Sequence, residues 1–100
     1  MADKIIWTFK AKQELIEILQ YWIDRNKSNS FSIKLNSLIE KDLNLILESP
    51  RIGRITDVPE VYVKVVHKYL LYYQISDNTL YVLTIRHRSK NPKTLKLSSE

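Results

Sequence analysis

Residues 61–88 form three apolar runs of strand length, separated by two dipeptides that favour turns. Asp77-Asn78 lies between runs rich in Tyr, Ile, Leu and Val, and is a typical two-residue hairpin turn. His67-Lys68 holds the same place between the first two runs, although this dipeptide is a weaker turn signal. Because connections this short join only antiparallel strands, the segment predicts an antiparallel sheet of three strands at the C-terminal end of the fold.

The two turns also predict which residues pair, and alternation along the strands then sorts the side chains into two faces. The expected pairs are Ser76 with Thr79, Tyr73 with Val82, Leu71 with Thr84, Val66 with Tyr69, Lys64 with Leu71 and Tyr62 with Tyr73. The face expected to receive helices is aliphatic and carries Val61, Val63, Val65, Leu70, Tyr72, Leu83 and Ile85. The face expected to remain open carries Tyr62, Lys64, Leu71, Tyr73, Val82, Thr84, Arg86 and, if the strand continues, Arg88.

The first half of the chain predicts one strand and two helices. Residues 5–9 are a short β-branched and aromatic run typical of a strand, and Thr8 is a candidate cap for the helix that follows. Apolar residues recur at helical spacing over residues 11–25, and again from Phe31 until Ser49-Pro50 ends the second helix. Between them, the polar residues 26–30 break the pattern, and Ser28 or Ser30 is expected to cap the second helix. The fold class is therefore α+β: an N-terminal strand, an antiparallel two-helix hairpin and an antiparallel sheet of three C-terminal strands.

The composition fits one compact domain spanning residues 1–100. There is no cysteine, so disulfides and thiolate chemistry are excluded, and a reducing cytoplasm suits the chain. No run of about 18 apolar residues predicts a membrane span, and no membrane partner is expected. The two histidines lack metal-ligand spacing and the single glycine excludes a glycine-rich phosphate loop, so no metal and no cofactor is expected.

Charge is unevenly distributed along the chain. Residues 1–50 contain seven Lys or Arg and seven Asp or Glu, whereas residues 51–100 contain nine and four, so the whole net charge of +5 arises in the second half. Such asymmetry indicates a polyanionic or acidic partner. Aromatic and cationic side chains on an open sheet face are what single-stranded RNA needs, because rings stack bases and cations neutralise phosphates. The alternative is an ordinary solvated face on which Tyr62 and Tyr73 are a cross-strand packing pair.

Several motifs, taken in order, resemble the RelE/ParE superfamily of toxins from bacterial type II toxin–antitoxin systems, which includes plasmid-stabilisation systems. The resemblance spans nearly the whole chain. It rests on the run from Ile5 to Ala11, on Tyr21-Trp22, on residues 49–53, on residues 63–75, and on residues 80–88 followed by Asn91-Pro92. It implies a strand, two packed helices and a curved antiparallel sheet, which agrees with the order of elements expected from the residue patterns.

The resemblance also implies two different targets. RelE-like toxins cut mRNA in the ribosomal A site, whereas ParE-like toxins poison DNA gyrase, and both are held inactive by an antitoxin, expected here to be small and acidic. For the ribonuclease branch it implies basic residues at the end of the last strand, here Arg88 and Arg86, with Lys90 beyond them. Further basic groups precede the sheet or lie in its first strand, namely Arg51, Arg54 and Lys64. Tyr62 stands where many relatives carry an arginine.

Metal-independent RNA cleavage by a ribose 2′-OH needs an oriented nucleophile, stabilised phosphate charge and a proton donor for the leaving oxygen. Arg88 and Lys64 are candidates for stabilising the phosphate, with Arg86 in support. His87 is a candidate general acid because its ordinary pKa lies near neutrality, but alternation points it away from Arg86 and Arg88, so it is alternatively an edge histidine. Tyr62 and Tyr73 are candidates for stacking a base. The favoured hypothesis is a ribosome-dependent mRNA endoribonuclease that inhibits translation, and the alternatives are a DNA gyrase inhibitor and a non-toxic antitoxin-binding protein.

Overall fold

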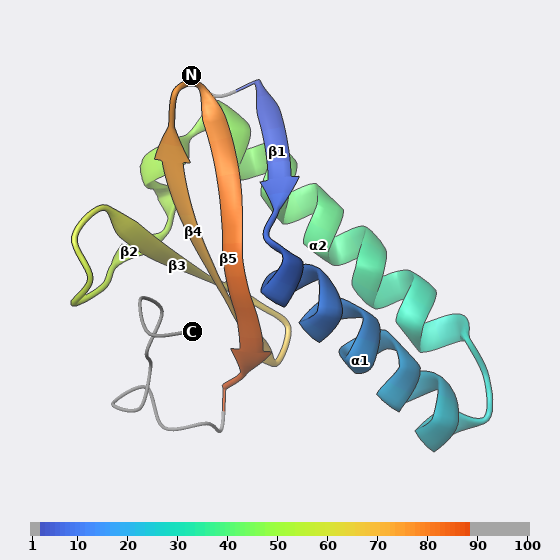
Figure 1. Cartoon of the computed structure of the whole chain (residues 1–100). Coiled ribbons are helices and arrows are strands. Elements are labelled where there is room, and N and C mark those ends of the chain that lie inside the picture. Colours follow the sequence, from blue (N-terminus) through green and yellow to red (C-terminus); the bar gives the residue numbers. More distant parts are fainter. Residues whose placement is uncertain (1–2, 89–100) are drawn as a thin grey trace.

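The computed structural model describes residues 3–88, which form a five-stranded sheet packed against two helices (Figure 1). In chain order the elements are β1 (Lys4–Trp7), α1 (Phe9–Asn26), α2 (Ser30–Glu48), the 3₁₀ helix η1 (Pro50–Ile52), β2 (Arg54–Ile55), β3 (Val61–Val66), β4 (Tyr69–Ser76) and β5 (Thr79–His87). This order confirms the predicted fold class. Neither helix is long and apolar enough to cross a membrane.

The strands lie in the order β1-β5-β4-β3-β2. The three C-terminal strands pair antiparallel, as predicted from their turns. β1 adds to β5 in parallel, which places the first and last strands side by side (Figure 1). The two-residue β2 extends the other edge by pairing with β3, and this short strand was not predicted.

Local sequence explains where the helices begin and end. The Thr8 hydroxyl accepts a hydrogen bond from the Ala11 N–H at 3.1 Å, so Thr8 is the predicted cap of α1. Lys27, with φ of 54°, ends this helix in the left-handed conformation. The Ser28 hydroxyl accepts from the Ser30 N–H at 3.2 Å, but the capping position of α2 is Asn29. Ser49 then closes α2 before the proline.

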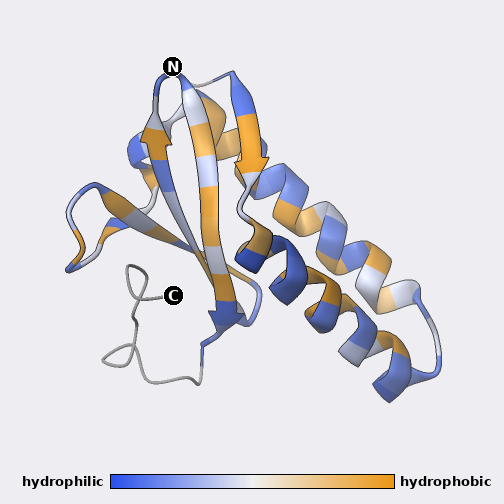
Figure 2. Ribbon diagram, viewed as in Figure 1, coloured by the Kyte–Doolittle hydropathy of each residue, from blue (hydrophilic) through white to orange (hydrophobic). Residues whose placement is uncertain are grey.

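The core lies between the helices and one face of the sheet, and the apolar stripes of both helices face it (Figure 2). Its buried members are Ala11, Leu35, Ile39, Leu43, Ile46, Val66, Tyr69, Leu71, Tyr73, Leu80, Val82 and Ile85. Trp7 and Trp22 pack against this cluster as half-buried anchors. The Trp22 Nε1–H donates to the Tyr69 hydroxyl at 2.7 Å, so a hydrogen bond also joins α1 to the sheet.

The predicted register is confirmed for five of the six pairs and wrong for the sixth. Asp77 and Asn78 both have positive φ, as a tight two-residue turn requires, and Tyr73 pairs with Val82. The register shifts immediately afterwards, because Tyr72 pairs with Thr84 and leaves Leu83 as a bulge. Leu71 therefore pairs with Ile85 rather than with Thr84.

The prediction of which face receives the helices is wrong along β3 and β4, whereas Ile85 of β5 lies in the core as predicted. Leu71, Tyr73 and Val82 are fully buried in the core with α1 and α2, whereas Val65 is 43% exposed. Both faces of these strands carry apolar residues, so alternation separated the two faces correctly along β3 and β4 but did not identify the inner one. The helix-facing side of the sheet therefore includes Tyr62 and Lys64, which had been expected on the open side.

Candidate functional site

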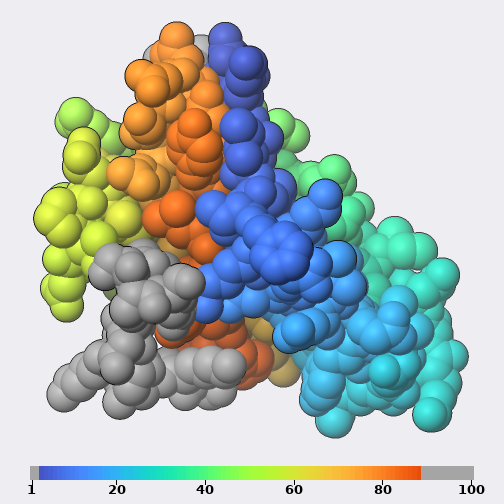
Figure 3. Space-filling model, in the orientation of Figure 1, coloured from blue at the N-terminus to red at the C-terminus, as the bar shows by residue number. Residues whose placement is uncertain are grey.

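The face of the sheet turned away from α2 is the first candidate for a binding surface, and we call it the open face. Residues are assigned to it by their pairing and by alternation with the buried ones. Its apolar members are Ile6, Val61, Val63, Val65, Leu70, Tyr72 and Tyr81, of which Val61 and Tyr72 are buried. Its cations are Lys4, Arg54 and Arg86. Figure 3 shows the molecule in the orientation of Figure 1, with strands β4 and β5 on the near side.

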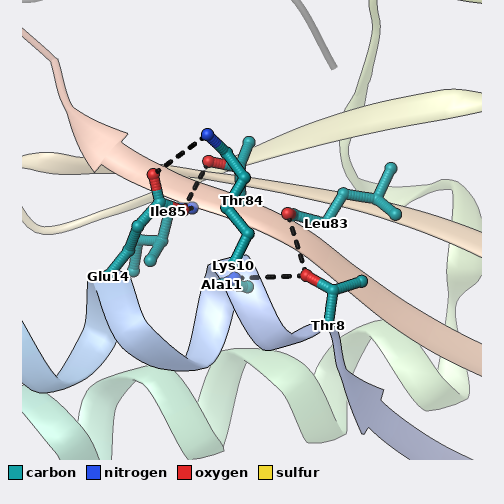
Figure 4. Close-up of polar contacts among 7 residues, drawn as sticks. All are labelled: Thr8, Lys10, Ala11, Glu14, Leu83, Thr84 and Ile85. Carbon is teal, nitrogen blue, oxygen red and sulfur yellow. Dashed lines mark hydrogen bonds and ion pairs between the residues drawn. The ribbon is translucent and has the colours of Figure 1, made fainter. Parts of the chain in front are cut away.

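The second half of β5 pairs with β4 on one edge, but on its other edge β1 pairs only as far as Val82, and α1 contacts the strand there instead (Figure 4). The Thr8 hydroxyl donates to the Leu83 carbonyl at 3.1 Å. One carboxylate oxygen of Glu14 accepts from the Thr84 hydroxyl at 2.6 Å and from the Ile85 N–H at 3.2 Å. Glu14 therefore accepts the hydrogen bond of the Ile85 N–H, a strand-edge donor that a longer β1 would otherwise pair.

A cleft of about 480 Å³ follows this contact, between α1 and the ends of β4 and β5. Aromatic and charged side chains line it together, among them Tyr21, Trp22, Arg25, Lys68, Tyr69, Arg86 and His87. Glu14 and Glu17 also line it, so the cleft is not purely cationic. Among the described residues, no acceptor reaches the buried Nε of Arg86.

The four candidate catalytic residues do not converge on one point. Lys64 lies on the helix-facing side, where its Nζ is 3.6 Å from the Asp42 carboxylate of α2. Arg86 pairs with Leu70 and lies on the open face. His87 pairs with Tyr69 and stacks edge-on against its ring at 5.4 Å, so it lies on the opposite side from Arg86, as alternation predicted. Arg88 is exposed after β5, and its backbone N–H donates to the Lys68 carbonyl at 2.8 Å.

Tyr62 and Tyr73 form the predicted cross-strand pair, with ring centroids 5.6 Å apart and an angle of 19° between the planes. Tyr73 is fully buried. Its hydroxyl donates to the Pro50 carbonyl at 2.7 Å and accepts from the Gly53 N–H at 3.1 Å. Burial raises the pKa of Tyr73, the Gly53 hydrogen bond opposes that rise, and Tyr62 adds to it. Both of the hydroxyl's contacts are structural, which argues against a base-stacking role for Tyr73.

Gly53 is required by this arrangement. A Cβ at this position would lie 2.6 Å from the Tyr73 hydroxyl oxygen and 2.8 Å from the Val63 carbonyl oxygen. The backbone here is extended, with φ of −80°, so close approach is the reason for glycine.

The remaining predicted binding residues are spread along the chain. Arg51 is exposed on η1, and Arg54 is exposed on the edge strand β2, three strands away from Arg86 on β5. Lys90 lies outside the described residues. His67 occupies the predicted turn with φ of 58° and packs edge-on against Phe31 at 5.2 Å.

Two acids have roles that sequence reasoning missed. Glu14 joins α1 to β5 through Thr84 and Ile85, and Asp42 of α2 pairs with Lys64. For Glu14 there was a signal, because position 14 lies beside the buried stripe through Ala11, Leu15 and Ile18. The role of Asp42 was not predictable without knowing that Lys64 lies on the helix-facing side of β3.

Comparison with known proteins decides the family. The model for the ParE toxin of the type II toxin–antitoxin system parDE matches residues 5–92. This chain belongs to the ParE toxin family. It is thus a toxin of the RelE/ParE superfamily, and membership in a type II system implies a cognate antitoxin as partner. No curated protein sequence matches the chain closely.

Two solved structures share the fold of this ParE-family chain. The chromosomal ParDE system of P. aeruginosa has a chain that superimposes with a TM-score of 0.71 at 17% identity, covering 84% of this chain and 94% of that one. A double arginine-to-alanine mutant of the E. coli toxin RelE, in the free state, gives a TM-score of 0.63 at 23% identity, covering 89% of this chain and 86% of that one. At these identities the likeness concerns the fold, which both branches of the superfamily have in common.

Proposed function

We propose that this toxin arrests growth by acting on DNA gyrase, and that a small acidic antitoxin holds it inactive. The ParE family match over residues 5–92 supports the toxin class. The choice of gyrase over ribosomal mRNA rests on one observation, the separation of the candidate ribonuclease cations. Lys64 forms an ion pair with Asp42 on the helix-facing side, while Arg86 lies on the opposite face.

RNA cleavage needs cations and a proton donor around one phosphate, within hydrogen-bonding distance of the reacting atoms. Here the centre of the open face is Val63, Val65 and Leu70, none of which neutralises a phosphate or transfers a proton. The stacked tyrosine pair is part of the core side, so it does not present its rings to a base. An activity that requires a protein surface rather than a phosphate site fits these residues better.

Inducible expression in a bacterium tests the proposal. The expected result is growth arrest with induction of the SOS response and with covalent gyrase–DNA complexes, while labelled amino acids are still incorporated in the first minutes. Co-expression of the adjacent short reading frame is the control and is expected to restore growth. Translation arrest that precedes any DNA damage contradicts the proposal, and so does unimpaired growth at a verified level of folded protein.

A ribosome-dependent mRNA endoribonuclease is the second candidate, because Arg86 and Arg88 bring two cations to the end of β5. The fold likeness to E. coli RelE is compatible with it. It predicts cleaved mRNA in a purified translation system, lost in the Arg86→Ala and Arg88→Ala variants. Intact mRNA at toxin concentrations that stop growth rules it out.

A further inference from the structure

The proposed function assigns no role to the cleft of about 480 Å³ between α1 and the ends of β4 and β5. Small-molecule sites in proteins typically have volumes of roughly 300–1,000 Å³, and this cleft lies within that range. A helix forms one of its walls and strand ends form the other, and aromatic rings line it together with charged groups. Its size and lining make it a candidate site for a small charged ligand.

One end of the cleft is acidic, but its charge is already engaged. One carboxylate oxygen of Glu14 accepts hydrogen bonds from Thr84 and Ile85 of β5. The Nζ of Lys10 lies 3.8 Å from the other oxygen. Glu14 therefore belongs to the contact between α1 and β5, and this end of the cleft does not attract a further anion.

The opposite end is cationic. Its three cations come from three different elements, the last turn of α1, the turn before β4 and the end of β5, and are Arg25, Lys68 and Arg86. The hydrogen bond between Trp22 and Tyr69 joins α1 to the start of β4 at this place. Within residues 3–88, no carboxylate forms an ion pair with any of the three cations. Such a group of cations favours a phosphate as ligand.

Tyr21 supplies an aromatic surface between the two ends. It lies one turn before Arg25 on α1, and it is 53% exposed. The Trp22 ring packs edge-on against it, with the centroids 5.1 Å apart, and Trp22 is itself held by its hydrogen bond to Tyr69. A flat ring of a ligand would therefore stack on a supported side chain, as bases stack on tyrosine in nucleic-acid-binding proteins.

We propose that this cleft binds a nucleoside monophosphate. Arg25, Lys68 and Arg86 hold the phosphate, and Tyr21 stacks on the base. Glu17, exposed one turn before Tyr21, accepts hydrogen bonds from hydroxyl or amino groups of the nucleoside. Eight residues separate Glu17 from Arg25, about 12 Å along the helix, which is comparable with the length of an extended nucleoside monophosphate. The site is one of binding and is independent of the action on gyrase.

Three other ligands use these groups less completely. Inorganic phosphate would contact the cations but neither the ring of Tyr21 nor Glu17. An acidic peptide or a longer RNA strand would bring further negative charge toward Glu14 and Glu17, at the end of the cleft where like charges repel it. Each of these ligands is therefore an outcome of the test rather than part of the proposal.

Calorimetry of the whole toxin with AMP and with GMP measures the binding. Typical ligand efficiencies for molecules of this size predict a dissociation constant of roughly 10–100 μM. Adenosine and inorganic phosphate each lack one half of the ligand, and both are expected to bind at least about tenfold more weakly. In a proton–nitrogen correlation spectrum, AMP is expected to shift the indole N–H signal of Trp22, which lines the cleft, but not that of Trp7, which does not.

Substitutions of exposed residues test each part of the site. Arg25→Gln and Lys68→Gln are each expected to weaken AMP binding by about tenfold or more, because each removes a charge that faces the phosphate. Tyr21→Ala is expected to weaken it by about tenfold, whereas Tyr21→Phe keeps the ring and the affinity. The matched controls are Lys34→Gln on α2 and Phe9→Ala at the start of α1, which are exposed outside the cleft and are expected to change the affinity less than twofold.

Thermal unfolding of each variant verifies the fold. The inference is overturned if neither nucleotide binds at millimolar concentration, if inorganic phosphate binds as tightly as AMP, or if the Arg25 and Lys68 variants bind AMP like the wild type. A hexaglutamate peptide or an RNA oligonucleotide that binds more tightly than AMP through these residues also overturns it. A toxin that poisons gyrase without binding AMP refutes this site alone. AMP binding by a toxin that leaves gyrase unaffected refutes only the proposed function.

Discussion

Leu70 and Leu71 are neighbours on β4 with the same side chain, yet Leu71 is fully buried with the helices while Leu70 lies half-buried on the open face. The same contrast holds across the sheet. On the helix-facing side, Tyr73 and Lys64 have polar partners from η1 and α2, which fix the fold. On the open face, apolar residues lie beside the cations Lys4, Arg54 and Arg86. The difference teaches that residue type alone does not separate the inner face of this sheet from the open one; the partners of each side chain do.

The largest effect is expected where the two faces are compared most directly. Leu71→Ala leaves a cavity in a fully buried core and is expected to lower the free energy of unfolding by about 2–5 kcal/mol. Leu70→Ala, on the open face, is expected to cost less than half as much. Urea denaturation of both variants measures the comparison, and equal losses would show that the two faces are packed alike.

The Tyr73 hydroxyl gives the next largest effect. Tyr73→Phe leaves the Pro50 carbonyl and the Gly53 N–H without this partner, at an expected cost of about 1–3 kcal/mol in unfolding free energy. Tyr62→Phe keeps the stacked pair and serves as the control. A Tyr73→Phe variant that is as stable as wild type but no longer toxic would contradict a structural role for this hydroxyl.

Glu14 tests whether α1 holds the free edge of β5. Glu14→Gln keeps one oxygen acceptor but loses the charge-assisted bonds to Thr84 and Ile85, and is expected to destabilise the toxin by about 1 kcal/mol. Glu17→Gln, exposed on the same helix, is the control. Faster hydrogen exchange confined to the Ile85 amide region is the specific readout, and an unchanged rate there would contradict the contact.

The smallest effect is a dependence of stability on alkaline pH. Burial raises the pKa of Tyr73 and of Tyr72, and Arg86 only partly offsets the rise at Tyr72. A folded-state pKa above the ordinary value near 10 means that the neutral form is favoured in the fold, so this stability is present below pH 10 and is lost as the pH rises beyond it. Denaturation between pH 9 and 11 measures the slope, which Tyr73→Phe is expected to reduce.

Much of the fold was predictable because local signals agreed. The Asp77-Asn78 turn, the Thr8 cap and the helical stripes each specify their element, and five of six residue pairs followed from the two turns. The family resemblance, confirmed over residues 5–92, gave the same order of elements. The bulge at Leu83 was not predictable, since no glycine or proline marks it.

The candidate site was predicted less well, for a physical reason. Where both faces of a strand are apolar, the face that becomes buried is the one that the helices cover. The sequence of the strand alone does not specify which face that is. Lys64 illustrates this, because its position next to Asp42 depends on how α2 lies on β3. The open-face position predicted for Arg86 is confirmed, whereas the one predicted for Lys64 is wrong.

Growth inhibition by the Lys64→Gln variant tests the division between the two faces most directly. Because Lys64 forms a structural ion pair with Asp42, the variant is expected to remain fully toxic, with at most about 1 kcal/mol lost in stability. Asp42→Asn, which removes the other half of the pair, is expected to behave in the same way. A folded Lys64→Gln toxin that no longer stops growth, beside a toxic Asp42→Asn variant, would contradict the account and return Lys64 to the site.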